Sequence, residues 1–212
     1  MTPVEVYTLI RNQITEASPD FYGETELYNL IWNAEKILAA ETGCAETSSS
    51  ISSAAGTREY TRPTTAQRIS RLTWDKTKLK KINFTDIDKF EGDTENDGDP
   101  IFYYEYGTSI GLVPTPISIA DIKIYFNAVP TQLTALSTAF TIPSEYAHYL
   151  SDYALSFMYM KDQQMSEADR HKGAWETNLK VVKDQWGSRR AMDSYPVVRD
   201  EDAYPFTDQG II

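Results

Sequence analysis

Apolar residues recur every three or four positions in two segments near each end of the chain. Such spacing places apolar side chains on one face of a helix. It predicts four helices, over residues 3–17, 24–42, 144–162 and 166–187. The first begins with a capping box, in which Thr2 is followed by Pro3 and Glu5. Gly43 stands where a left-handed cap would end the second helix.

Between residues 45 and 126 the helical spacing disappears. Residues 68–74 alternate polar and apolar side chains, which is typical of a half-buried strand, and Leu79 and Ile82 suit its hairpin partner. Residues 101–106 and 121–126 are further strand candidates, with turns marked by Gly107, Gly111, Pro114 and Pro116. The predicted fold class is therefore α+β: mainly a helical bundle of about four helices, with a β-rich insertion at 45–126.

The last residues show no helical period. We expect a single domain at residues 1–190 and an extended C-terminal arm at residues 191–212, with a net charge of −4 from five acids and one arginine. Aromatic and isoleucine side chains along a flexible acidic segment suit a chain that orders on a partner. The candidate docking residues are Tyr195, Tyr204, Phe206, Ile211 and Ile212.

The formal net charge of −11 argues against general binding to nucleic-acid phosphates. Residues 58–89 are an exception, because they hold nine Lys or Arg against four Asp or Glu. They form either an exposed strand face of mixed charge or a docking surface for an acidic partner. Because Cys44 is the only cysteine, no internal disulfide is possible, which fits a reducing cytoplasm. Neither a signal peptide nor a membrane span is expected.

No catalytic motif stands out in the sequence. His148 and His171 lie on predicted helices without ligands at metal-binding spacing, so helix packing is the favoured interpretation. Cys44 would need a histidine from far away to act as a nucleophile. Phosphate loops and dinucleotide fingerprints are missing, and nothing selects one pair of carboxylates. We therefore predict no enzyme, no catalytic residue, no metal site and no cofactor.

One acidic segment, residues 91–99, resembles the first half of a calcium-binding loop. Asp93, Asp97 and Gly98 stand at positions one, five and six of such a loop. Position twelve should supply a bidentate carboxylate, but Tyr104 occupies it. A solvated acidic turn is the favoured interpretation, and a weak divalent-cation site is the alternative.

Several short motifs follow one another in a recognisable order. After two helices come Gly-x-x-x-Tyr at residues 56–60, Pro63, and Arg-Ile-x-x-Leu at residues 68–72. Asp-Ile-x-Ile-Tyr-Phe, Val-Pro, Ile-Pro-Ser-Glu-Tyr and Leu-Ser-Asp-Tyr-Ala-Leu then follow at residues 121–126, 129–130, 142–146 and 150–155. This order resembles the adaptor, or head-to-tail connector, proteins of tailed phages over about residues 2–187. The acidic loop and the aromatic arm depart from that pattern.

The resemblance implies a structural virion protein. It implies a ring, usually of twelve copies, that joins the portal protein to tail or nozzle proteins in the virion neck after assembly in the host cytoplasm. Genomic DNA would pass through the ring without specific binding, because a channel lined by like charge does not grip a polyanion. Two alternatives stay open: a neck or tail-completion protein of the same virion, and a carbohydrate-binding module that uses the tyrosine-rich β layer.

Overall fold

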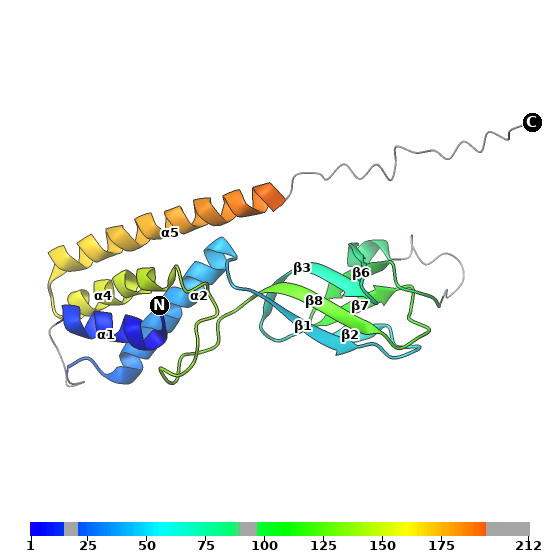
Figure 1. The fold of residues 1–212 in the computed structure, drawn as a ribbon, viewed down its shortest axis with the longest axis horizontal. Coiled ribbons are helices and arrows are strands. Elements are labelled where there is room, and N and C mark those ends of the chain that lie inside the picture. Colours follow the sequence, from blue (N-terminus) through cyan, green and yellow to red (C-terminus); the bar gives the residue numbers. More distant parts are fainter. Residues whose placement is uncertain (15–20, 88, 90–96, 194–212) are drawn as a thin grey trace, which may run out of the picture.

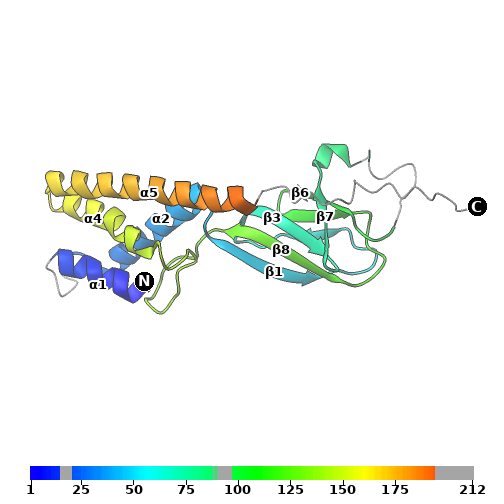
Figure 2. The same ribbon diagram turned by 45° about the horizontal axis from the view of Figure 1, so that its top comes forward.

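The computed structural model describes residues 1–14, 21–87, 89 and 97–193. Helices from both ends of the chain form one body, here called the helical body, and the strands between them form a second, the β body (Figure 1). The two bodies lie end to end along the long axis of the molecule (Figures 1 and 2). Two linkers, residues 43–45 and 129–146, join them.

The helical body contains four α-helices and one short 3-10 helix, which are α1 (Pro3–Gln13), α2 (Glu24–Thr42), η2 (Ala147–Tyr149), α4 (Leu150–Lys161) and α5 (Met165–Asp193). Each predicted helix is confirmed, but the ends differ. The first prediction runs past the end of α1 into residues 15–20, which lie outside the described part of the chain. The third begins later, because residues 143–146 form a turn before η2.

The predicted caps of the first two helices are confirmed. The Thr2 hydroxyl accepts from the Glu5 backbone N–H at 3.3 Å, and the Glu5 carboxylate accepts from the Thr2 N–H at 2.8 Å. Gly43 has a φ of 68°, the left-handed conformation that glycine adopts without strain. Local sequence therefore determines where these helices begin and end.

Gly187 does not end α5, which continues to Asp193. A glycine inside a helix costs about 1 kcal/mol, and contacts of the neighbouring residues offset that cost. Trp186 packs edge-on against Tyr146 with 6.4 Å between the ring centroids, and Arg189 pairs with Glu145 at 3.3 Å. Residues 191–193, which were predicted to belong to the arm, are therefore part of α5, and the rest of the predicted arm lies outside the described residues.

The β body contains two four-stranded sheets, called sheet A and sheet B. Sheet A has the order β1 (Glu46–Ser52), β8 (Asp121–Ala128), β3 (Ala66–Trp74), β4 (Thr77–Lys78). Sheet B has the order β2 (Glu59–Thr61), β7 (Ser109–Val113), β6 (Phe102–Tyr106), β5 (Lys80–Lys81). All pairs are antiparallel except β5 with β6. A short 3-10 helix, η1 (Phe84–Asp86), follows β5.

The chain changes sheets directly after the hairpin that was predicted to follow residue 74. Asp75 and Lys76 have φ values of 44° and 67°, as a two-residue hairpin turn requires. The Leu79 N–H still donates to the Leu72 carbonyl in sheet A, whereas the Lys80 N–H donates to the Ile101 carbonyl next to sheet B. The buried Leu79 side chain thus lies where the two sheets are joined.

Gly111 lies inside β7 and not in a turn, contrary to its predicted role. It is paired with Tyr104 of β6, and a Cβ added to Gly111 would lie 2.0 Å from the Tyr104 ring. The glycine is required because the ring lies flat across it. The Tyr104 hydroxyl donates to the Glu59 carboxylate of β2 at 3.1 Å, so the Tyr104 side chain contacts both β7 and β2.

The prediction of a mainly helical bundle is wrong. The structure is 42% helix and 25% strand, and the sheets enclose a hydrophobic cluster separate from that of the helices. The strands were underestimated because β2, β4 and β5 have only two or three residues, too few to show alternation. Strand β1 is largely serine and shows no apolar period. That residues 1–190 behave as a single domain stays a prediction.

Candidate docking surfaces

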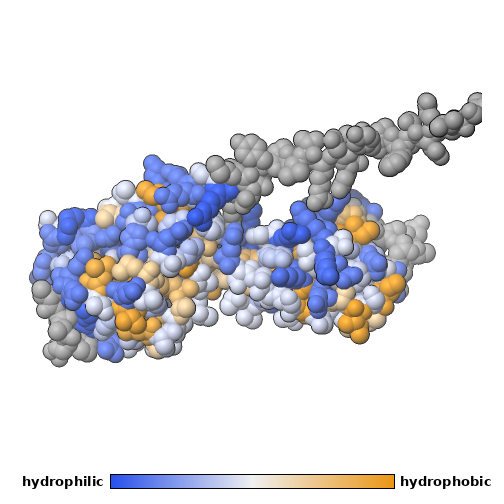
Figure 3. Space-filling view, viewed as in Figure 1, coloured by the Kyte–Doolittle hydropathy of each residue, from blue (hydrophilic) through white to orange (hydrophobic). Residues whose placement is uncertain are grey.

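The five predicted docking residues of the arm lie outside the described residues, so their role stays a prediction. The described part of the chain offers other surfaces for contact with partners. Figure 3 shows apolar side chains over the helical body near α1 and α4, and at the end of the β body far from the helices. In both places several apolar side chains lie together at the surface, which is typical of contact sites.

A groove of about 240 Å³ runs between α4 and α5. Phe157 and Met160 line it, and they are 42% and 45% exposed. Tyr153 packs beneath them, with its ring centroid 4.9 Å from that of Phe157 and 5.4 Å from that of Trp175. Lys172 and Glu176 give the groove a charged rim. An apolar floor with a charged rim suits a protein partner.

A second apolar surface is the loop of residues 114–120, which connects β7 to β8 at the far end of the β body (Figure 1). Ile117 and Ile119 on this loop are 59% and 77% exposed. The loop is held in place by the buried Ser53, whose hydroxyl accepts from the Ala120 N–H at 2.8 Å. The Gly56 N–H also donates to the Pro116 carbonyl at 2.8 Å. A loop fixed in this way presents its isoleucines at little entropic cost.

The basic segment 58–89 is divided between the two sheets and does not form one surface. In sheet B, Arg62 and Lys81 both pair with Glu105. In sheet A, Arg71 lies over the Tyr125 ring at 5.8 Å, and Lys123 of β8 lies over the same ring at 5.1 Å. This arrangement fits the interpretation of exposed strand faces of mixed charge. If an acidic partner docks on the segment, the basic side chains available on one face are those of sheet A alone.

Glu35 holds one linker against the helical body. Glu35 is 2% exposed, and its carboxylate accepts hydrogen bonds from the backbone N–H groups of Thr141 and Ile142 at 2.5 and 3.3 Å. Burial raises the pKa of Glu35 to about 7, and the two hydrogen bonds offset only part of this rise. One of the contacts between this linker and the helical body thus involves a titratable group.

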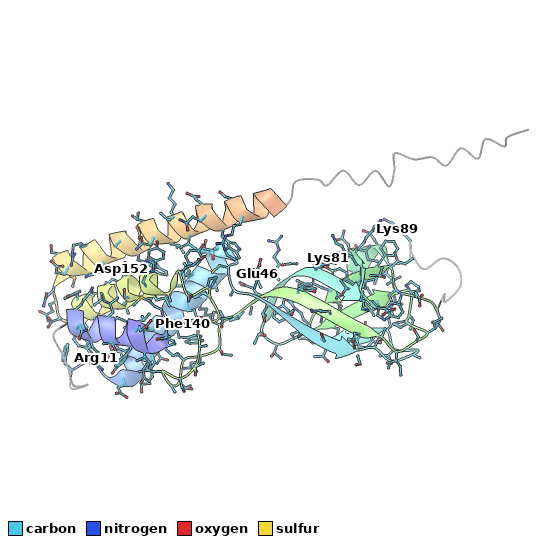
Figure 4. The ribbon with its side chains drawn as sticks, viewed as in Figure 1. Arg11, Glu46, Lys81, Lys89, Phe140 and Asp152 are labelled. Atoms are coloured by element: carbon cyan, nitrogen blue, oxygen red, sulfur yellow. The ribbon has the colours of Figure 1, made fainter. Side chains whose placement is uncertain are left out.

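Asp152 connects α4 to α5, and Figure 4 shows it between these helices. Its carboxylate lies 2.9 Å from Nδ1 of the buried His171 and accepts from Asn178 at 3.1 Å. The other ring nitrogen of His171 lies 3.2 Å from an Arg170 nitrogen, and the ring stacks on Tyr159 at 5.4 Å. Both nitrogens are therefore engaged, and the histidine joins two helices as predicted.

The model of one protein family, described as SU10 adaptor protein, matches residues 2–200 of the chain. The chain belongs to this family. The resemblance to tailed-phage adaptors is thereby confirmed, and the molecule is a phage adaptor protein. No curated protein matches it. Adaptors are structural proteins, whereas the absence of any catalytic activity stays a prediction for this one.

The remaining candidate chemistry of the adaptor offers little to a substrate. Cys44 is 2% exposed, and burial raises the pKa of its thiol, which disfavours the reactive thiolate. Most of the acidic segment 91–99 lies outside the described residues. Tyr104, at the twelfth position of the would-be calcium loop, is buried in β6. Within the described ranges, no three His, Cys, Asp or Glu side chains are grouped to hold a metal ion.

The described helices of the adaptor include none that is long and apolar enough to cross a membrane. Sequence reasoning missed the two exposed isoleucines and the Glu35 contact. A signal for Ile117 and Ile119 was present, since two isoleucines flank one serine next to Pro116, where a turn was expected. Nothing near Glu35 in the sequence indicates that a linker more than a hundred residues away covers it.

Proposed function

We propose that this adaptor is one subunit of a closed ring of twelve copies that joins the portal to the tail. The observation that carries this proposal is the family match, which spans residues 2–200 and includes both bodies. The family implies a place in the virion neck and contact with other virion components such as portal and tail proteins. Genomic DNA then passes through the channel of the ring.

The shape of the subunit supports a connecting role. Two bodies placed end to end give one chain two separate ends, each able to meet a different component (Figures 1 and 2). The groove between α4 and α5 lies on one body, and the loop with Ile117 and Ile119 lies at the end of the other. The net charge of −11 favours DNA passage, since an acidic channel does not retain phosphates.

The arm, residues 194–212, attaches each copy to the portal or to a neighbouring copy. Its anchors are the five predicted docking residues, Tyr195, Tyr204, Phe206, Ile211 and Ile212. Burial of each contributes roughly 1.5–3 kcal/mol, against about 1–2 kcal/mol of backbone entropy per ordered residue. The net gain per arm is small, so stable attachment requires several arms docking together, as a ring allows.

Imaging of the purified virion by electron cryomicroscopy tests the proposal. The expected result is a closed ring of this chain between portal and tail, around a channel that contains DNA. Density for the chain only at another position of the neck or tail would support the neck or tail-completion alternative instead. A truncation after Asp193 tests the arm separately: the melting temperature stays nearly unchanged, and the truncated chain no longer attaches stably in the particle.

A further inference from the structure

Strand β1 forms one edge of sheet A and pairs on one side with β8. No other strand of the described residues lies along its second side. The other three edges are much shorter, because β2 has three residues and β4 and β5 have two each. Short edge strands and charged residues such as Lys80 and Lys81 discourage unwanted pairing. β1, with seven residues, is therefore the long open edge of the molecule.

The register shows which backbone groups of β1 are free. Just beyond its two ends, the Ala128 N–H donates to the Ala45 carbonyl and the Ser53 N–H donates to the Ala120 carbonyl, both at 2.7 Å. Backbone groups alternate sides along a strand, and the register of β1 with β8 has no shift. The backbone N–H and C=O groups of the odd-numbered residues therefore point toward β8. The N–H and C=O groups of Ser48, Ser50 and Ser52 point to the open side.

Little in β1 protects this open side, because Glu46 at its first position is its only charged residue. Residues 47–52 contain no charge and no proline. The strand has no bulge, whereas β3 in the same sheet has two register shifts. Natural proteins usually block a long regular edge with such features, because it is a template for another strand. An edge left open over seven residues is suited to receive an extended segment.

We propose that the edge of β1 receives residues 194–212 of a neighbouring copy as an added strand. This inference rests on the proposed ring and chooses the neighbouring copy, not the portal, as the docking place of the arm. The segment has 19 residues and can reach at most about 63 Å when extended. It contains proline-free stretches of eight and seven residues, 197–204 and 206–212, and each is long enough to cover β1.

The position of α5 favours this occupant. The helix extends along the long axis as far as the linkers between the two bodies (Figures 1 and 2). β1 begins at Glu46, which Figure 4 labels at the same junction. The arm thus leaves the helix near the level at which β1 starts. Its 19 residues are nearly three times the seven of β1, so a neighbouring copy in a ring lies within reach.

The charges of the two segments are complementary. Residues 194–212 contain four acids and one arginine. On the outer face of sheet A, the exposed Lys123 is paired directly with Ser50 of β1, and Arg71 follows across β8. A strand added to β1 would place its acidic side chains on the same face as these cations. These cations lie two strands or more, about 10 Å, from the added strand, so they attract its acids over a longer range than directly paired neighbours do.

The symmetry of a ring also favours the arm, and not the β1 of another copy, as the strand that pairs with the open edge of β1. Pairing of β1 with β1 uses the same surface twice and gives a two-fold dimer. An arm that joins the β1 of the next copy uses two different surfaces, so it continues from copy to copy until the ring closes. The small net gain from each arm then adds up over all the copies.

Hydrogen exchange of the full chain tests this proposal. In dilute solution the amides of Thr47, Ser49 and Ile51 should exchange slowly, and those of Ser48, Ser50 and Ser52 should exchange fast. A synthetic peptide of residues 194–212, added in excess, should slow the second set by about tenfold or more. A peptide of the same composition in scrambled order should not. Ser50→Pro should abolish the effect, since proline removes one open-edge N–H. Ser50→Thr keeps that N–H and should retain it.

Three outcomes would overturn the inference. They are unchanged exchange of Ser48, Ser50 and Ser52 at saturating peptide, equal peptide binding by Ser50→Pro and Ser50→Thr, and slow exchange of these amides in the dilute chain that does not depend on concentration. The last would show that the chain's own arm covers the edge. If Ser50→Pro fails to fold, the effect of the peptide on amide exchange in the unmodified chain still tests the proposal. Imaging of the virion tests the ring itself. If imaging shows the ring but the peptide does not slow exchange, only this inference is refuted. If the peptide slows exchange but imaging shows no ring, only the proposed function is refuted.

Discussion

The helical body and the β body are stabilised in different ways. The helical body joins the two ends of the chain, and polar side chains such as the buried Glu35 and the half-buried Asp152 hold its distant segments together. The β body uses one continuous stretch, residues 46–128, and backbone ladders between neighbouring strands. The comparison indicates that the helical body depends on side-chain contacts between segments distant in the sequence, whereas the β body depends on strand register and leaves an edge open.

The largest expected effect comes from removing a buried leucine in each body. Leu155 lies in the helical cluster and Leu112 in the cluster between the sheets, and both are fully buried. Leu155→Ala and Leu112→Ala should each lower the free energy of unfolding by about 2–5 kcal/mol. Because the two described clusters are separate, each variant should lose amide protection first in its own body, as measured by hydrogen exchange.

The same pair of variants tests the domain prediction. Equal loss of protection in both bodies by either variant would contradict the separation and would support one folding unit over residues 1–190. Separate losses would show that the linkers transmit little stability between the bodies. Thermal unfolding followed by calorimetry gives the same answer independently, through one transition or two.

The second effect is the pH dependence that Glu35 contributes to the helical body. The folded chain retains the Glu35 proton up to a pKa of about 7, whereas the unfolded chain releases it near 4.5. Because the folded pKa is raised, this group contributes stability below pH 4.5 that is lost as pH rises to about 7. The loss is on the order of 3 kcal/mol at most. In Glu35→Gln this part of the pH dependence should disappear.

Urea unfolding at several pH values between 4 and 8 measures this effect. Glu41→Gln is the matched control, because Glu41 lies in the same helix, with its side chain 52% exposed and paired with Lys183. That variant should keep the pH dependence of the unmodified chain. If Glu35→Gln kept the pH profile of the unmodified chain, the pH dependence of the free energy of unfolding would not come from Glu35.

The smallest expected effect on stability concerns the exposed loop of the β body. Ile119→Ser should change the free energy of unfolding by no more than about 0.5 kcal/mol, since Ile119 is 77% exposed. Ile122→Ser, three residues later on β8, should lower it by several times that amount, because Ile122 is buried between the sheets. Chemical denaturation of both variants measures the difference. A strongly destabilised Ile119→Ser would show that the loop is part of the core.

The sequence by itself determined the features that depend on neighbouring residues. The four helices follow from apolar spacing, the capping box of Thr2 and Glu5 and the left-handed Gly43 follow from local backbone chemistry, and the family follows from short motifs in order. These signals lie within a few residues of one another. They can therefore be recognised before the chain is folded.

Only the tertiary structure decided the features that join distant residues. Gly111 was expected in a turn, but a ring from another strand requires it inside β7. The fourth helix was predicted to end at residue 187, which is a glycine, but contacts with Glu145 and Tyr146 stabilise α5 beyond it. The balance between helix and strand was misjudged for the same reason. Strands of two or three residues, and a serine-rich edge, are stabilised by pairing partners that no local pattern records.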